Sequence, residues 1–392
     1  MSFYVALMLK MLFNKITGQE NVKARLVQTV KDSRISHAQL FLGPEGNGKL
    51  ALAIAYAQYI NCRDKQNGDA CGICPSCIKY NKLEHPDLHF IFPVANTSEV
   101  KGKPTSKQFL KHWRELLLEK NACISLSDWY NKIGIENKQG VIYTEDCNDI
   151  IRTLNYKSYE SEYKVMIIWM VEKLYHAAAP KILKILEEPP DKTLFVLIAE
   201  NQYQIINTIL SRSQIVKIPR IADDAMEKYL SGEKGLAEEE VRRITTQAGG
   251  NLNKAVQMID KQEEEADNFE EFRNWMRLCY SFKIIEINAF VSMISKIGRE
   301  KQKLFLQRAA TTLRSSILMN YNLEELARID EMEKDFMQKF HPFMNPANGH
   351  AINQEINSAI YHIERNANPS IVFMDLTLKL AALMQKGSVS KN

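Results

Sequence analysis

The stretch "GPEGNGKL", residues 43–50, decides the fold class of this 392-residue chain. It lies between an apolar run, "AQLFL" (38–42), and a segment of helical character, "KLALAIAYAQYI" (49–60). A glycine-rich turn between a strand and a helix is typical of a phosphate-binding loop, in which backbone N–H groups surround the phosphates and a lysine contacts the terminal ones. This context favours a P-loop over a chance cluster of glycines. The candidate nucleotide-binding residues are Gly43, Gly46, Gly48 and Lys49.

The catalytic half of such a loop is missing from the sequence. The last position, where a Ser or Thr hydroxyl would ligate magnesium, is Leu50. A neighbouring strand should end in acids that hold the metal and activate water, but the run that fits best ends in Trp169 and Met170. Glu172 is either a displaced acid or an ordinary acid in the first turn of the next helix. We therefore predict a degenerate loop that binds ATP weakly or not at all and hydrolyses none in cis.

Further apolar runs predict a parallel sheet. Residues 87–93, 163–170 and 193–200 are short and apolar, as suits strands buried on both faces with helices as the crossovers between them. The fold class is therefore α/β with a doubly wound core. Residues 95–140 interrupt the pattern with a polar, basic stretch followed by helical spacing. They are predicted to form a surface insertion carrying one or two helices.

From about residue 220 onward the pattern is helical. The segment "EEEVRRITTQA" is expected to form a helix that ends at Gly249 and Gly250. The last helix is expected to begin at Asn368, a capping residue followed by proline, and to end at Gly387. The second part of the chain is thus predicted to be all-α.

Composition narrows the class of partner and the compartment. A net charge of +4, from 51 basic and 47 acidic residues, is too small to indicate nucleic-acid binding by bulk charge. No run is apolar and long enough to span a membrane. Residues 1–10 have the features of neither a signal peptide nor an anchor, and we expect them to be an upstream extension. Seven cysteines, an odd number, argue against a disulfide framework and favour the reducing cytoplasm.

Four of the cysteines form a candidate metal site. The segment "CRDKQNGDACGICPSC" places Cys62, Cys71, Cys74 and Cys77 within 16 residues, and four thiolates can surround one tetrahedral Zn²⁺. Structural zinc is favoured over free thiols, and an iron–sulfur cluster also uses four cysteines. Because all four ligands come from the protein, no position is open for catalytic water. The site is predicted to be structural.

Taken together, these motifs resemble the subunits of bacterial DNA polymerase III clamp loaders. The resemblance is carried by "HAQLFLGPEGNGK", the four-cysteine module, "HPDLHFIFP", "YKVMIIWMVEKLYHAAAPKILKILEEPP" and "TILSRSQ", and it spans about residues 12–260. It implies an AAA+ P-loop domain over 1–219 that includes the zinc module and the insertion. It further implies a helical lid over 220–262 and a C-terminal helical collar over 263–392.

Among the subunits of these clamp loaders, a chain that lacks the nucleotide machinery resembles the delta-prime type. The resemblance implies a non-hydrolysing scaffold that acts with gamma/tau and delta subunits in a hetero-pentamer, for loading the sliding clamp on primed DNA. It also implies an arginine finger, Arg212, that acts on a neighbouring subunit's ATP, although Ser213 departs from the usual Ser-Arg-Cys pattern. Without the resemblance, Arg212 would be expected to pair with a local acid. Asn253 stands where the lid's nucleotide-sensing arginine is usual.

Two other functions fit parts of the sequence. The first is an active AAA+ ATPase of the gamma/tau type with unusual metal ligands, Glu172 among them. The second is a zinc-module nucleic-acid binder, against which the cysteine segment is only moderately basic and has little aromatic interleaving.

Overall fold

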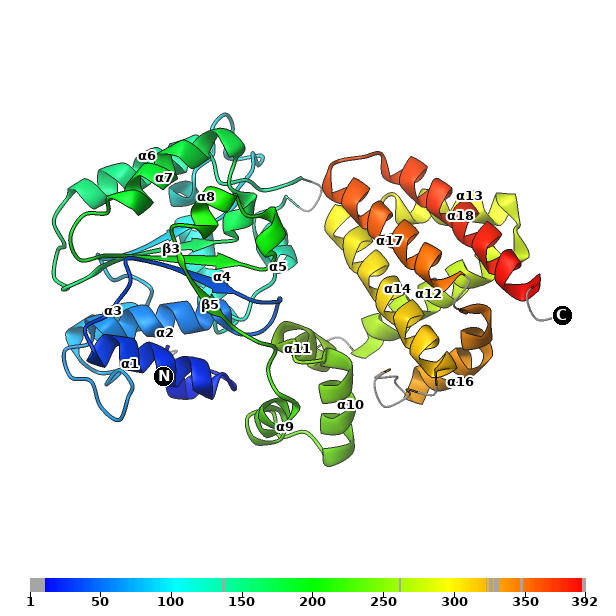
Figure 1. Ribbon diagram of the computed structural model, residues 1–392, viewed down its shortest axis with the longest axis horizontal. Helices are drawn as coiled ribbons and strands as arrows, with labels where there is room; N and C mark the ends of the chain where they lie inside the picture. The colour runs from blue at the N-terminus through cyan, green and yellow to red at the C-terminus, as the bar shows by residue number, and fades with distance from the viewer. Residues whose placement is uncertain are drawn as a thin grey trace, which may run out of the picture. The chain divides into compact units, whose positions relative to one another are not determined.

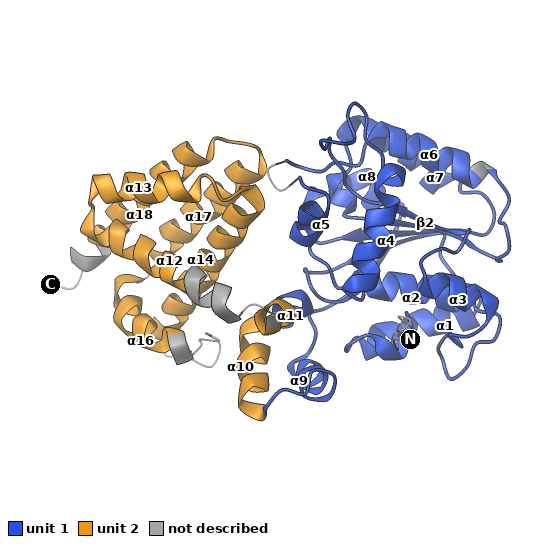
Figure 2. Cartoon of the chain, turned by 180° about the vertical axis from the view of Figure 1, so that it is seen from behind, with its two compact units in different colours: residues 1–237, 250–254 blue, residues 238–249, 255–392 orange. Residues whose placement is uncertain are grey.

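The computed structural model describes residues 11–135, 138–260, 262–321, 323, 327, 331–345 and 348–389. The expected upstream extension, residues 1–10, lies outside the described residues. The chain divides into two compact units, shown in Figure 2: residues 1–237 with 250–254, and residues 238–249 with 255–392. The three-domain division at 219 and 262 stays a prediction.

The first unit is built on a five-stranded parallel sheet of order β2-β3-β4-β1-β5. The strands are β1 (Ala38–Leu42), β2 (Leu88–Ile91), β3 (Lys164–Trp169), β4 (Thr193–Ala199) and β5 (Gln214–Lys217). Four of them confirm the predicted strands. The short edge strand β5 was not predicted, because only Val216 of its four residues is buried and the segment has no apolar run.

Helices cover both faces of this sheet, which confirms the doubly wound α/β core. The helices of the first unit are α1 (Glu20–Lys31), α2 (Lys49–Asn61), α3 (Pro75–Asn81), α4 (Leu110–Glu119), α5 (Leu126–Lys132), α6 (Thr144–Asn155), α7 (Ala179–Glu187), α8 (Asn207–Leu210) and α9 (Asp223–Gly232). Helices α1 and α2 lie on one face of the sheet, and α6 and α7 lie on the other (Figure 1). Successive strand residues therefore enter different cores: Phe41 packs with α2, whereas Leu40 and Leu42 pack with α6 and α7.

The prediction of a surface insertion is wrong in one respect. Residues 95–140 do carry two helices, α4 and α5, but the inner faces of these helices belong to the core beside α2. Trp113 and Trp129 are fully buried, and the Trp129 indole N–H donates to the Pro93 carbonyl at 2.8 Å. The polar start of the segment concealed this burial. The helical spacing of its aromatic residues gives α4 and α5 a buried face.

The second unit is all-α, as predicted. Its helices are α10 (Glu238–Ala248), α12 (Gln262–Ser281), α13 (Ile284–Ile294), α14 (Arg299–Asn320), α16 (Glu331–Phe340), α17 (Gly349–Glu364) and α18 (Pro369–Val389), and α11 (Leu252–Asp260) runs from one unit into the other. Its core surrounds Trp275, whose ring packs with Phe290, Phe305 and Phe373 and whose indole N–H donates to Thr377 Oγ1 at 2.9 Å.

The predicted helix ends agree with the structure in one case and not in the other. Helix α10 ends before Gly249 and Gly250, both of which have positive φ. Helix α18 begins as predicted but continues past Gly387 to Val389. A single glycine costs a helix only about 1 kcal/mol, so it does not by itself end one.

Candidate phosphate loop, cysteine cluster and arginine finger

The glycine-rich loop lies where the sequence predicts it, between the carboxyl end of β1 and the N-terminus of α2. Gly46 has φ 71° and Gly48, the N-cap of α2, has φ 80°. Residues other than glycine rarely adopt these φ angles. The loop keeps the backbone form of a phosphate cradle.

Lys49 is buried and already has two partners. Its Nζ donates to the Pro44 carbonyl at 2.8 Å and to Glu200 Oε1 at 3.2 Å, and its side chain is only 6% exposed. Glu200 directly follows β4, the strand next to β1 in the sheet. Sequence reasoning did not single out Glu200. The available signal was its position, because the carboxyl ends of parallel strands meet at one edge of the sheet.

The positions that should hold magnesium are part of the core. Leu50 is 4% exposed and packs among the apolar residues of α2 and the sheet. Trp169, the last residue of β3, is buried, with its ring centroid 5.1 Å from that of Trp113. Met170 is 4% exposed and has φ 58°. None of these three side chains can ligate a metal through oxygen or accept a proton from water.

Glu172 lies beside the loop in a short 3₁₀ turn, Val171–Lys173, rather than in the first turn of an α-helix. Its Oε1 accepts the backbone N–H of Glu200 at 2.7 Å, and its Oε2 has no hydrogen-bond partner among the described residues. Burial raises the pKa of the Glu172 carboxyl, and the bond from Glu200 opposes that rise. Both acids at this edge of the sheet therefore belong to one small network with Lys49.

The four cysteines of the predicted metal site come together. The Sγ atoms of Cys62, Cys71, Cys74 and Cys77 all lie within 4.8 Å of one another. Cys62 follows the last residue of α2. Cys74 is the N-cap of α3, whose first residue is Pro75.

Backbone N–H groups point at three of the sulfurs. The N–H of Cys71 donates to Cys62 Sγ at 3.3 Å, that of Cys74 donates to Cys71 Sγ at 3.3 Å, and that of Cys77 donates to Cys74 Sγ at 3.5 Å. Such bonds favour thiolates, which are the form that binds metal. The donor set and its closeness fit a tetrahedral Zn²⁺, with Zn–S bonds of about 2.3 Å.

Arg212 lies two residues beyond α8 and makes the local ion pair that the sequence alone would suggest. Its Nε donates to Glu187 Oε1 at 2.5 Å, and its Nη1 donates to the Thr208 carbonyl at 3.1 Å. The side chain is still 34% exposed, and that of Glu187 is 46% exposed. Within the described part of the chain, this guanidinium bonds to residues of α7, α8 and the turn after α8, and to no residue of the phosphate loop.

Asn253 does not face solvent. It is 4% exposed, and the thiol of Cys123 donates to its Oδ1 at 2.6 Å. At this position the chain makes an internal contact between the segment that joins α4 to α5 and the start of α11.

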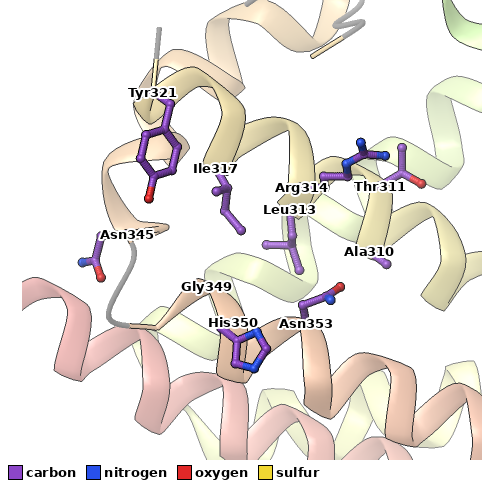
Figure 3. A pocket seen from close by; sticks show the side chains of 10 residues that line it. All are labelled: Ala310, Thr311, Leu313, Arg314, Ile317, Tyr321, Asn345, Gly349, His350 and Asn353. Carbon is purple, nitrogen blue, oxygen red and sulfur yellow. The ribbon is translucent and has the colours of Figure 1, made fainter. Parts of the chain in front are cut away.

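The second unit contains a cavity of about 560 Å³ between α14 and α17, and it includes none of the predicted site residues. Figure 3 shows Leu313 and Ile317 of α14 facing Gly349 and His350 of α17, and Arg314 of α14 also lines the cavity. None of the helices in the described part of the chain is both long and apolar enough to cross a bilayer.

Several known proteins match part of this chain. The tau subunit of DNA polymerase III from Bacillus subtilis is 27% identical over 254 residues, which are 64% of this chain and 37% of that protein. The delta' subunit from the same organism is 26% identical over 212 residues, 54% of this chain and 51% of that protein. The chain thus aligns with about a third to a half of the length of these relatives.

One solved structure was also matched. A gamma subunit-related protein of Thermotoga maritima matches 93% of this chain and 99% of its own, with 14% identity and a TM-score of 0.37. The family model described as "DNA polymerase III, delta subunit" matches residues 18–222. Because this match covers more than half of the 392 residues, the chain belongs to that family of clamp-loader proteins.

Proposed function

We propose that this chain is a non-hydrolysing, delta-prime-like subunit of a DNA polymerase III clamp loader. In this role it scaffolds a hetero-pentamer with gamma/tau and delta subunits, and the assembly loads the sliding clamp on primed DNA. The observation that carries the proposal is the replacement of the magnesium ligands. Leu50, Trp169 and Met170 are buried apolar side chains at the positions where a working P-loop ATPase needs a hydroxyl and acids.

Arg212 is the residue proposed to act on another subunit's ATP. A guanidinium beside a γ-phosphate stabilises the charge that develops during phosphoryl transfer, with effects of about 10³–10⁵ on turnover. Its partial exposure and its pairing with an exposed acid support this role, because a surface ion pair is weak and can exchange for a phosphate. Membership of the clamp-loader family and the position of Arg212 just after α8 also support this role.

Cys62, Cys71, Cys74 and Cys77 are proposed to hold one structural Zn²⁺. When bound, the ion would connect the end of α2 to the start of α3, and all four ligands come from the protein. The zinc module is therefore proposed to stabilise the first unit and to take no part in catalysis.

The test uses the full chain alone and in a reconstituted loader. The purified chain should show no magnesium-dependent ATP hydrolysis. In the loader, Arg212→Ala should lower ATP turnover while assembly, followed by size-exclusion chromatography, is unchanged. Arg34→Ala, which removes an exposed arginine elsewhere in the first unit, is the matched control. Turnover by the chain alone that Lys49→Ala abolishes would instead support the gamma/tau-type ATPase.

A further inference from the structure

The lysine of the phosphate loop already neutralises an anion of its own chain. Lys49 Nζ lies 3.2 Å from Glu200 Oε1, at a site where the lysine side chain is 6% exposed. In a nucleotide-binding loop the same amine would contact the terminal phosphates. Glu200 therefore forms the ion pair with Lys49 that a bound phosphate would otherwise form.

A backbone amide at the start of α2 is also bonded within the chain. The N–H of Lys49 donates to Asn47 Oδ1 at 3.2 Å, and Asn47 Nδ2 donates to the Ile218 carbonyl at 2.7 Å. Asn47 is fully buried. Because helix N-terminal amides are the groups that bind phosphate oxygens, this side chain acts as an internal cap in place of a ligand.

A third contact covers the loop at Gly46. The N–H of Leu252 donates to the Gly46 carbonyl at 2.8 Å. A Cβ added to Gly46 would lie 1.8 Å from Asn251 Oδ1, so this side chain rests directly on the glycine. The segment that precedes α11 thus packs against the loop.

Glu200 is held in place by the second acid of the network. Its backbone N–H donates to Glu172 Oε1 at 2.7 Å, which fixes the chain where it leaves β4. Burial raises the pKa of the Glu172 carboxyl, and the nearby charge of Lys49 opposes that rise. The acid that forms the ion pair with the lysine, at 3.2 Å, is Glu200.

We propose that Glu200 is an internal substitute for the nucleotide phosphate, and that with Asn47 it closes the loop against nucleotides. The inference rests on the proposed function only in treating residues 43–50 as a former phosphate loop. A triphosphate entering the cradle would have to break the Lys49–Glu200 pair and would then face an uncompensated carboxylate at close range. Like charges at such close range repel, and the Glu200 side chain is only 28% exposed, so solvent screens this repulsion in part.

The experiment titrates ATP with magnesium, and inorganic phosphate separately, into the full chain by calorimetry. Wild type should show no saturable binding at millimolar ligand. Glu200→Gln, which keeps the shape and removes the charge, should bind ATP at least ten-fold more tightly. The matched control, Glu188→Gln, removes an exposed acid of the same unit and should behave as wild type. Adding Lys49→Ala to Glu200→Gln should abolish the gained affinity.

Glu200→Ala is titrated in parallel, so that a folding defect in one variant does not decide the result. No gain of affinity in either variant, or failure of both to fold, would overturn the inference, since a closing ion pair should be dispensable for folding. Weaker binding in Glu200→Gln than in wild type would also overturn it and identify Glu200 as a metal ligand. If wild type binds ATP tightly without hydrolysing it, this inference is wrong and the proposed function is not affected. If wild type hydrolyses ATP, the proposed function is wrong.

Discussion

Glu172 accepts the backbone N–H of Glu200 at 2.7 Å, although 28 residues separate them in the chain. The bond joins the ends of β3 and β4, which are neighbours in the sheet. At this edge a working ATPase would gather its metal-binding acids around a phosphate. Here the two acids are arranged around a lysine instead, and the surrounding positions are apolar.

Restoring the missing hydroxyl should not restore hydrolysis. Leu50→Thr places a magnesium ligand at the end of the loop, but Trp169 and Met170 still supply no acid. The same change removes buried apolar volume and should lower the free energy of unfolding by about 2–5 kcal/mol. Urea denaturation and a magnesium-dependent ATPase assay measure both effects. Leu50→Met, of similar volume, should cost less than about 1.5 kcal/mol. ATP turnover by Leu50→Thr would contradict the expectation.

Breaking the Arg212–Glu187 pair should cost little stability. Both side chains are about one-third to one-half exposed, and pairs of this kind contribute about 0–1 kcal/mol. Glu187→Gln should therefore unfold within about 1 kcal/mol of wild type in urea. In a reconstituted loader it should reduce ATP turnover far less than Arg212→Ala does. Equal losses in the two variants would show that the pair, rather than the free guanidinium, is needed.

The cysteine cluster should contain one zinc per chain. Cys74→Ser removes one of the four ligands, and the metal content measured by inductively coupled plasma mass spectrometry should fall from about one to near zero. Loss of about 2 kcal/mol of metal-linked stability would lower the thermal midpoint of the first unit by about 4–8 °C. Cys279→Ser, in the core of the second unit, should keep the full zinc content. Iron in place of zinc would indicate the cluster alternative.

Asp146 should give the first unit a measurable pH dependence. Burial is the largest cause that raises the pKa of this carboxyl to about 6, although it accepts the backbone N–H groups of Ser106 at 2.7 Å and Tyr143 at 3.2 Å. The folded protein therefore binds its proton more tightly than the unfolded chain does. The free energy of unfolding should fall as the pH rises from about 4 to about 6, by about 3 kcal/mol at most.

Asp146→Asn tests that assignment. The variant removes the titration, so the slope of stability against pH between about 4 and 6 should flatten. It also leaves one of the two N–H groups without an acceptor, at a cost of about 1–3 kcal/mol that does not depend on pH. Denaturation at several pH values separates the two effects. An unchanged slope would show that another group titrates in this range.

Much of the fold could be predicted from local sequence. Each of the four apolar runs became a buried strand, and the loop formed between the strand and the helix that flank it. The four cysteines also came together because their spacing keeps them within one short segment. What the local pattern could not supply was the pairing of Lys49 with Glu200, which are 151 residues apart. Only the strand order brings the end of β4 beside the loop.

The insertion was the larger error in the fold. Its polar beginning suggested a solvated segment, whereas burial was decided by Trp113 and Trp129 on the inner faces of two helices. Whether such faces meet a core depends on tertiary packing and not on the local pattern. Strand β5 was missed for a related reason, since an edge strand with one buried residue lacks the apolar run that marks a central one.

The position of Trp169 has a consequence for how this protein can change over time. Its indole packs against Trp113, which stacks on Phe92 and meets Trp129 edge to face. An aspartate in its place would bury a charge among aromatic rings and remove a large side chain from their midst. The residue at this position therefore contributes to the packing that stabilises the domain. An acid could be accommodated here only if the aromatic residues of α4 and α5 around it were replaced as well.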